Sequence, residues 1–315
     1  MSPRNTLRLP NLLVIGAQKC GTTWLYERLR RHPDIFLSKT KELSFFGKQD
    51  ARRDLEVYAE NFLEAGSARY VGEATPGYFW ARDRSRNFFG SGPRQLQLHT
   101  ALAVRDALGA DVRLILLLRH PVHRAVSAFM HHFKQGRIAA RDRILDLQKR
   151  LLDFDFRYGV VEMGFYERHY WPWERVFGTD KMLVLFTDDV LVDPVSTLER
   201  VTAFLDIPLV DVEGAERMIH GGLKLAISDN TLTVDADDPE TRETLHRNGL
   251  GETGFPRVHH EEILELQEIY GPDIAFVERR FGRPDLGWHV APRLEDFLIP
   301  RAPNEQEDRA RNVEQ

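Results

Sequence analysis

Two glycines five positions apart, Gly16 and Gly21, enclose Lys19 and lead directly into two hydroxyl side chains, Thr22 and Thr23. An apolar run precedes the first glycine and a helical pattern follows the second. Successive backbone N–H groups in such a turn, with the positive end of the following helix, bind phosphate oxygens. The spacing is close to the loop of nucleotide triphosphatases, but Thr22 stands where that loop has its lysine. The pattern predicts a nucleotide-like anion site with Lys19 as a ligand.

A second set of polar residues follows the most apolar segment of the chain, residues 112–118. Arg119 comes directly after this segment, Pro121 suits the first turn of a helix, and Ser127 lies two turns further on. Arginine and serine in this arrangement can approach one phosphate. A kinase would instead have an acidic residue here to hold magnesium. The sequence therefore predicts a phosphate site without the metal ligand of a triphosphatase.

Two kinds of side chain are candidates for a general base. Glu42 precedes the apolar residues 43–46, and partial burial would raise the pKa of its carboxyl group toward a useful value. The alternative is a solvated carboxylate beside Lys41. Histidine is the rival base, although a structural or surface role is favoured for each, and the adjacent pair on a helix does not form a natural metal site. The histidines considered are His99, His120, His123, His131 and His132.

Three apolar runs, each followed by a helical pattern, indicate the fold class. This alternation predicts an α/β protein with a P-loop-type parallel sheet flanked by helices on both faces. The most apolar run is expected to lie beside the first, so that both polar segments meet in one crevice at the carboxyl ends of the strands. The strand–helix pairs are 12–15 with 24–31, 112–118 with 122–133, and 182–186 with 195–205.

The remaining segments give weaker signals. Residues 82–105 are expected to form a surface excursion that turns helical, residues 141–158 an amphipathic helix, and residues 229–254 a mobile loop. We predict one domain over residues 1–302 and a disordered tail over 303–315.

Composition limits the function classes. The formal net charge of −5 gives no general case for nucleic acid or an acidic membrane surface as a partner. No run approaches the roughly 20 apolar residues of a membrane span, and no signal peptide is recognised, so we expect a cytoplasmic protein. The single cysteine, Cys20, excludes an intramolecular disulfide, and loop packing is favoured over a reactive thiol.

Together, the Lys19 loop and the Arg119–Ser127 pair resemble the donor-binding signatures of sulfotransferases that use 3'-phosphoadenosine 5'-phosphosulfate (PAPS). In that family the loop binds the 5'-phosphosulfate, and an arginine and a serine eight residues apart bind the 3'-phosphate. Residues 32–35, 41–47 and 72–79 resemble blocks of the heparan-sulfate branch and its bacterial relatives. Residues 253–257 resemble the loop that closes over the donor.

This resemblance implies roles for particular residues. Lys19 and Glu42 would be catalytic, Trp24 would stack on adenine or fill the core, and Tyr78 and Phe79 would line the acceptor cleft or fill the core. Donor-binding residues would be Gln18, Lys19, Cys20, Gly21, Thr22, Thr23, Trp24, Arg119, Ser127, Gly254 and Arg257.

The implied activity is transfer of a sulfuryl group from PAPS, without a metal, to a hydroxyl of a small metabolite, glycolipid or saccharide. Ala74 departs from some glycosaminoglycan relatives, which carry lysine there, so a glycosaminoglycan acceptor is less favoured. Aromatic residues at 78–80 and 88–89 slightly favour an acceptor with apolar surface. Two other function classes stay open: a P-loop nucleotide kinase and a non-catalytic nucleotide-binding module.

Overall fold

A parallel sheet of five strands, in the order β2-β3-β1-β4-β5, lies at the centre of the structure. The computed structural model describes residues 8–46, 54–80, 98–149, 158–210, 212–216, 222–250 and 254–298. The strands are β1 (Leu12–Gly16), β2 (Ile35–Leu37), β3 (Tyr70–Ala74), β4 (Arg113–Leu118) and β5 (Met182–Phe186). The three predicted strands are confirmed as β1, β4 and β5. The apolar pattern did not reveal β2, which is short, or β3, which contains a charged residue.

The centre of the sheet is formed by the two most apolar strands. Every residue of β1 is buried, as is every residue of β4 after Arg113. Their parallel pairing runs from Leu12 opposite Arg113 to Gly16 opposite Leu116, which confirms that these two strands are neighbours. Strands buried on both faces have no need of alternating polar residues, so both read as continuous apolar runs.

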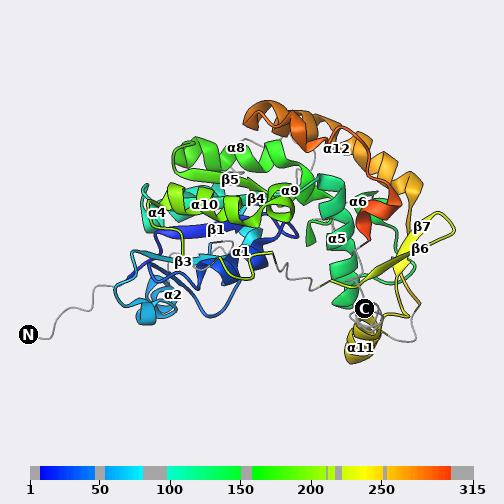
Figure 1. Ribbon diagram of the computed structural model, residues 1–315, viewed down its shortest axis with the longest axis horizontal. Coiled ribbons are helices and arrows are strands. Elements are labelled where there is room, and N and C mark those ends of the chain that lie inside the picture. Colours follow the sequence, from blue (N-terminus) through cyan, green and yellow to red (C-terminus); the bar gives the residue numbers. More distant parts are fainter. Residues whose placement is uncertain are drawn as a thin grey trace, which may run out of the picture.

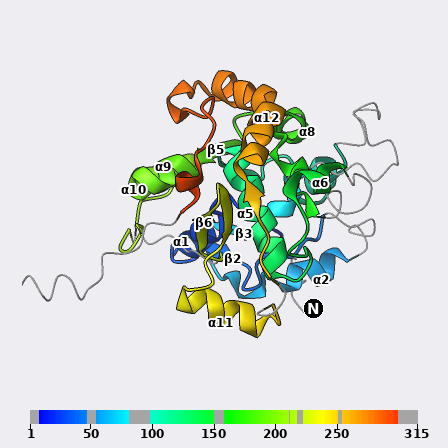
Figure 2. The ribbon, with the colours of Figure 1, turned by 90° about the vertical axis from the view of Figure 1, so that its right-hand side faces the viewer.

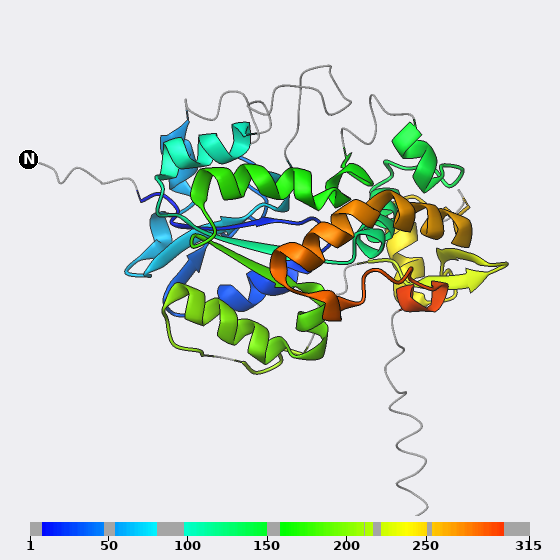
Figure 3. The same cartoon turned by 90° about the horizontal axis from the view of Figure 1, so that it is seen from above.

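Helices cover both faces of this sheet, as predicted. Figure 3 shows α4 and α8 on one face, and α1 and α10 on the other. Helix α12 crosses the carboxyl end of the sheet and packs on both α5 and α8. The helices are α1 (Thr22–Leu29), α2 (Leu55–Glu60), α4 (His99–Leu108), α5 (Pro121–Lys134), α6 (Ile144–Lys149), α8 (Tyr166–Phe177), α9 (Thr187–Val192), α10 (Pro194–Leu205), α11 (Pro239–Arg247) and α12 (His260–Phe281).

A second, antiparallel sheet corrects the prediction of a mobile loop over residues 229–254. Strands β6 (Leu225–Ser228), β7 (Thr231–Val234) and β8 (Val258–His259) pair in that order, and α11 follows β7. The β6–β7 turn is Asp229-Asn230, both left-handed, which are residue types suited to a tight hairpin. Asp238 then caps α11 by accepting the N–H of Thr241 at 2.8 Å. The polar composition of this region reflects turn and cap residues.

The second sheet lies at the end of the molecule to which β1 and β4 lead. Figures 1 and 2 show the β6–β7 hairpin and α11 beside α5, the helix that continues from β4. Helix α6 covers the first part of the predicted amphipathic helix, and α4 is the helical part of the predicted excursion. Residues 81–97, 150–157 and the 303–315 tail lie outside the described residues.

Gly72 in β3 tests how tightly the sheet is packed. A Cβ atom at this position would stand 2.1 Å from the carbonyl oxygen of Leu12, whereas at exposed Gly77 it would meet nothing within 4 Å. We expect Gly72→Ala to lower the free energy of unfolding by at least about 3 kcal/mol, because backbone must move, and Gly77→Ala to change it by less than about 1 kcal/mol. Urea unfolding followed by circular dichroism measures both, and equal values for the two variants would contradict the packing described.

Candidate functional site

The predicted phosphate loop leaves β1 and enters α1 as a tight turn. The N–H of Ala17 donates to the carbonyl of Leu117 at 2.7 Å, so the loop starts against the end of β4. Gly21, at the N-cap of α1, has φ 89° and no side chain to occupy the first amides of the helix. Gly16 is equally constrained, because an added Cβ would lie 2.5 Å from the Cβ of Phe79. Both glycines thus meet structural requirements of a strand–loop–helix anion site.

Side chains from two other elements tie this loop to the Arg119 segment. The hydroxyl of Thr187 is within hydrogen-bond distance of the carbonyls of Cys20 (2.9 Å) and Leu118 (3.1 Å). The hydroxyl of Tyr166 donates to the carbonyl of Arg119 at 2.6 Å. The two segments singled out from the sequence therefore meet at one edge of the sheet.

Arg119 is half-buried at the end of β4. Burial lowers the pKa of its guanidinium, and the nearby carboxylate of Asp188 opposes this shift. A guanidinium stays charged in proteins despite such shifts. Among the described residues, no group accepts a hydrogen bond from the Arg119 guanidinium or forms an ion pair with it, so its N–H donors are available to a ligand.

Helix α5 exposes a single polar stripe. Ten of its residues are buried, and the other four, spaced by four, four and three positions, lie on one face of the helix. These four are His123, Ser127, His131 and Lys134. Ser127 is thus placed on the accessible face, as its predicted role requires, and Lys134 continues that face two turns further along.

Positive charge converges on Lys19. The pKa of its amine is lowered to about 8, first by burial and then by the charges of Arg119, Lys134 and Lys41, whereas the charge of Glu42 opposes this shift. Lys19 is also left-handed, with φ 67°, a conformation that costs a non-glycine residue about 1 kcal/mol. Like charges held together this way disfavour one another, and an anion bound among them would relieve the repulsion.

Glu42 differs from the expectation of partial burial. Its carboxylate is paired with the Lys41 ammonium at 2.8 Å, and its side chain is 58% exposed. The apolar residues that follow turn inward, ending in buried Phe46, while Glu42 itself stays at the surface. The expectation of partial burial is therefore wrong, although the charge of Glu42 acts on Lys19.

Four of the rival histidines are neutral at physiological pH. Burial lowers the pKa of His120 and His131 to about 4, of His132 to about 3 and of His123 to about 2. His120 caps α5 by accepting the N–H of Val122, and the ring of His123 stacks on Phe297 at 4.4 Å. A base with so low a pKa takes a proton poorly, and two of these rings already have packing or capping roles.

Several aromatic residues considered for ligand binding lie in the core. Tyr78 and Phe79 are 2% and 0% exposed, so the expectation that they line the acceptor cleft is wrong and core packing is correct. Trp80 is buried as well, and residues 88–89 lie outside the described residues. Trp24 is 1% exposed and donates its indole N–H to Ala215 at 2.9 Å, which leaves no free face for adenine in this structure.

The remaining residues predicted to bind the sulfuryl donor are Cys20, Gln18, Gly254 and Arg257. Cys20 is buried, and burial raises the pKa of its thiol to about 11, consistent with loop packing. Gln18 has a buried side-chain oxygen that accepts no hydrogen bond from the described residues. Gly254 and Arg257 are exposed in the segment before β8, and their proposed closure over the donor stays a prediction.

Three charged residues were missed by sequence reasoning. Lys41 and Lys134 act directly on Lys19, and Glu73 lies fully buried in β3. The signal for Lys134 was present, because it stands seven residues after Ser127 and helical periodicity puts both on one face. A carboxylate inside an apolar strand was the corresponding signal for Glu73.

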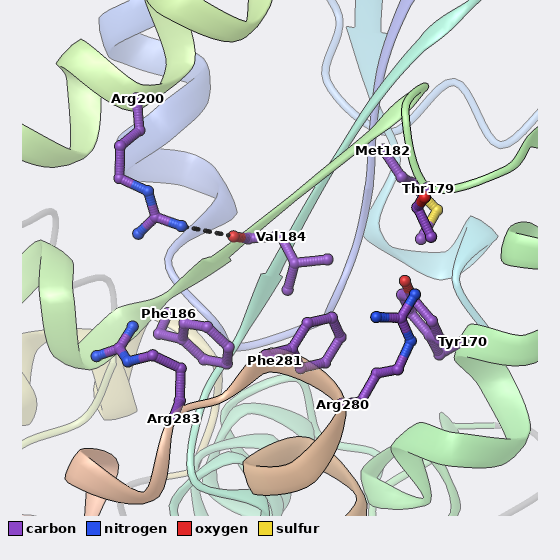
Figure 4. Close-up of a pocket in the computed structure, with 9 residues that line it drawn as sticks. All are labelled: Tyr170, Thr179, Met182, Val184, Phe186, Arg200, Arg280, Phe281 and Arg283. Atoms are coloured by element: carbon purple, nitrogen blue, oxygen red, sulfur yellow. Dashed lines mark hydrogen bonds between the residues drawn. The ribbon is translucent and has the colours of Figure 1, made fainter.

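A separate groove lies at the outer edge of β5 and contains none of the predicted site residues (Figure 4). Its cations are already neutralised: Arg283 and Arg200 pair with Asp189, and Arg280 pairs with Glu174. Arg200 also donates to the carbonyl of Val184, which occupies the free edge of the strand. The cations that line this groove are therefore already paired with carboxylates of the protein.

The chain belongs to the sulfotransferase domain family, whose model matches residues 9–247. It is 26% identical over 290 residues to heparan sulfate glucosamine 3-O-sulfotransferase 3B1 from Mus musculus, covering 89% of this chain and 65% of that protein. It is 27% identical over 292 residues to heparan sulfate glucosamine 3-O-sulfotransferase 6 from Homo sapiens, covering 89% and 74%. The chain thus spans less than two thirds of the mouse relative.

A solved structure shares the fold. The sulfotransferase from Alicyclobacillus acidocaldarius aligns with a TM-score of 0.61 and 24% identity, over 90% of this chain and all of that one. No helix among the described residues combines the length and apolar character that crossing a membrane requires.

The convergence of charge on Lys19 can be measured directly. We expect its amine to titrate near pH 8 and to lose its charge above that pH. Lys134→Ala should raise this pKa, because it removes a neighbouring positive charge. Lys224→Ala, whose ammonium pairs with Asp238, serves as the control and should leave it unchanged. NMR titration of the ¹³C-dimethylated protein measures the pKa, and no response to Lys134→Ala would contradict the proposed proximity.

Proposed function

We propose that this chain transfers a sulfuryl group from PAPS to an acceptor hydroxyl. The observation that carries this proposal is the gathering of four cations, Lys19, Lys41, Arg119 and Lys134, around a phosphate loop at the edge of a parallel sheet. Among the described residues that shift the pKa of Lys19, Glu42 is the carboxylate. Such an excess of positive charge suits a multiply charged anion, and membership of the sulfotransferase family favours the phosphosulfate donor.

In this proposal the donor's two charged ends bind to different elements. The amides and hydroxyls of residues 18–23, with Lys19, hold the 5'-phosphosulfate, and Arg119 and Ser127 hold the 3'-phosphate. Gly254 and Arg257 cover the bound nucleotide. Each group is a positively charged or neutral donor, so the residues present suit an anion.

The chemistry is an in-line displacement at sulfur. The acceptor oxygen forms a bond to sulfur while the bond from sulfur to the 5'-phosphate oxygen breaks, and Glu42 takes the proton of the acceptor hydroxyl. Negative charge builds on the departing phosphate oxygen, and Lys19 stabilises it from a fixed position. The products are the sulfated acceptor and adenosine 3',5'-bisphosphate.

A saccharide hydroxyl is the acceptor favoured by the relatives. Those from mouse and human are named for transfer to the 3-O position of glucosamine in heparan sulfate. The argument for an apolar acceptor loses its support from residues 78–80, because these side chains are buried. Ala74 remains a departure from the glycosaminoglycan pattern, so small metabolites and glycolipids belong in any acceptor screen.

The test is incubation of the protein with ³⁵S-labelled PAPS and a panel containing heparan sulfate, a neutral oligosaccharide, a glycolipid and a simple phenol. Label on one of these acceptors is the expected result. Binding of adenosine 3',5'-bisphosphate without transfer to any of them would instead indicate a non-catalytic module. Magnesium-dependent consumption of ATP would indicate a kinase.

Arg119→Ala is expected to weaken binding of adenosine 3',5'-bisphosphate at least about 30-fold, because a partly desolvated charge contact to phosphate is worth about 2 kcal/mol or more. Arg105→Ala, an exposed residue of α4, is the matched control and should leave the affinity unchanged. Titration calorimetry measures both variants. An unaltered affinity after Arg119→Ala would remove this residue from the site.

Glu42→Gln keeps the shape of the side chain and removes the base, so turnover should fall about 10²-fold to 10⁴-fold. Glu60→Gln, an exposed carboxylate on α2, should turn over normally. Both rates come from the labelled-donor assay at saturating PAPS. Normal turnover after Glu42→Gln would assign the base to another group.

A further inference from the structure

We propose that Glu73 is a positioning residue: a buried carboxylate that sets the conformation of residues 42–46 and so aims Glu42 at the reaction. This inference rests on the proposed function, in which Glu42 takes the acceptor's proton. Glu73 is 0% exposed, so no acceptor hydroxyl reaches it and it is not itself the base. Its effect on catalysis must pass through the segment that it holds.

Glu73 is a centre on which several donors converge. The hydroxyls of Tyr58 and Tyr78 each lie 2.7 Å from its Oε1, and the hydroxyl of Thr75 lies 2.6 Å from its Oε2. The backbone N–H of Leu43 also donates to it. Burial raises the pKa of this carboxyl, and these four hydrogen bonds oppose the rise by stabilising its charged form. Among the described residues it has no ion-pair partner.

Each backbone N–H of residues 42–46 donates to Glu73 or to a residue close to it in sequence. The N–H of Glu42 donates to the carbonyl of Ala74 at 3.0 Å, and the next N–H donates to Glu73. The N–H of Ser44 donates to the Thr75 hydroxyl at 3.3 Å. The two amides that follow, of Phe45 and Phe46, point at the Tyr78 hydroxyl at 2.8 and 3.4 Å.

The direction of these hydrogen bonds depends on Glu73. A tyrosine hydroxyl has one proton, and that of Tyr78 is donated in a hydrogen bond to the Glu73 carboxylate. The lone pairs of the same oxygen are then turned toward the amides of Phe45 and Phe46. Thr75 follows the same logic, donating to Glu73 and accepting from Ser44. The carboxylate therefore orients both hydroxyls as acceptors for the segment.

The held segment would not keep its conformation unaided. Glu42 and Ser44 are left-handed, with φ 66° and 54°, and each such residue costs about 1 kcal/mol. Strained backbone of this kind persists only where surrounding contacts determine it. The contacts here come from residues 73–78. The same part of the chain is also hydrogen-bonded to β1, through the N–H groups of Thr75 and Phe79. Because β1 carries the phosphate loop, Glu73 also fixes the position of Glu42 relative to Lys19.

Two tyrosines offer a matched test. The hydroxyls of Tyr58 and Tyr78 lie at the same distance from the same oxygen of Glu73, and both rings are buried. Of the two hydroxyls, only that of Tyr78 also accepts backbone N–H groups of residues 42–46 among the described residues. We expect Tyr78→Phe to lower kcat at least 10-fold and Tyr58→Phe to lower it less than 3-fold. Calorimetry should find the affinity for adenosine 3',5'-bisphosphate within 2-fold of wild type in both.

The measurement uses ³⁵S-labelled PAPS and the panel acceptor that the wild-type chain sulfates fastest. In a Glu42→Gln background, Tyr78→Phe should cause less than a 2-fold further loss of kcat, because the base whose position it controls is already absent. Where Tyr78→Phe does not fold, Thr75→Val, which removes the acceptor for the Ser44 amide, takes its place with the same expectations.

The outcomes separate the two proposals. Equal losses from the two tyrosine variants, wild-type kcat after Tyr78→Phe, or the full loss repeated in the Glu42→Gln background would each overturn the role of Glu73 and leave the proposed function standing. A wild-type chain that transfers label to no acceptor overturns the proposed function and this inference with it.

Discussion

The two parallel pairings of β1, with β3 on one side and β4 on the other, set the position of the main groups in the candidate site. Parallel strands end at the same edge, so three connections begin there: the phosphate loop after β1, the turn after β3 and Arg119 after β4. Hydrogen bonds across this edge then tie the connections together, including Ala17 to Leu117 and Thr75 to Val14. Three distant parts of the chain are therefore bonded together at one edge of the sheet.

This arrangement has an electrostatic cost. Holding Lys19 and Arg119 partly out of water lowers the pKa of each, and the charge of Arg119 also contributes to the lowered pKa of Lys19. Folding must supply the free energy that keeps them together, since each prefers water. Preorganised charge of this kind is useful to a catalyst, because no reorganisation is required when negative charge develops on the leaving group.

Sequence reasoning succeeded where a strong local pattern and the fold agree. The strand–loop–helix at Gly16 to Thr22 and the neighbouring strand ending at Leu118 follow from apolar runs and glycine spacing. It failed where tertiary packing decides: Glu42 is four residues before buried Phe46 yet exposed. For Tyr78 the sequence left cleft lining and core packing open, and the side chain is buried, donating its hydroxyl to Glu73. Such outcomes depend on side chains from distant elements, which no local pattern contains.

The Asp229-Asn230 hairpin is a different kind of miss. Asp and Asn are residue types typical of a tight turn, but the polar residues around them were interpreted as a mobile loop. Polarity there serves turns and helix caps, which local composition alone does not distinguish from lack of structure.

The single cysteine of the chain gives the phosphate loop an unexpected property. Oxidants and electrophiles attack a thiolate, and Cys20 is both protonated and enclosed, with its sulfur 3.9 Å from the Tyr166 hydroxyl. The Cys20 thiol is thus shielded from peroxide and alkylating agents while the loop is folded. Any modification of Cys20 would report that the loop had opened, so this thiol is a built-in probe of how often the site comes apart.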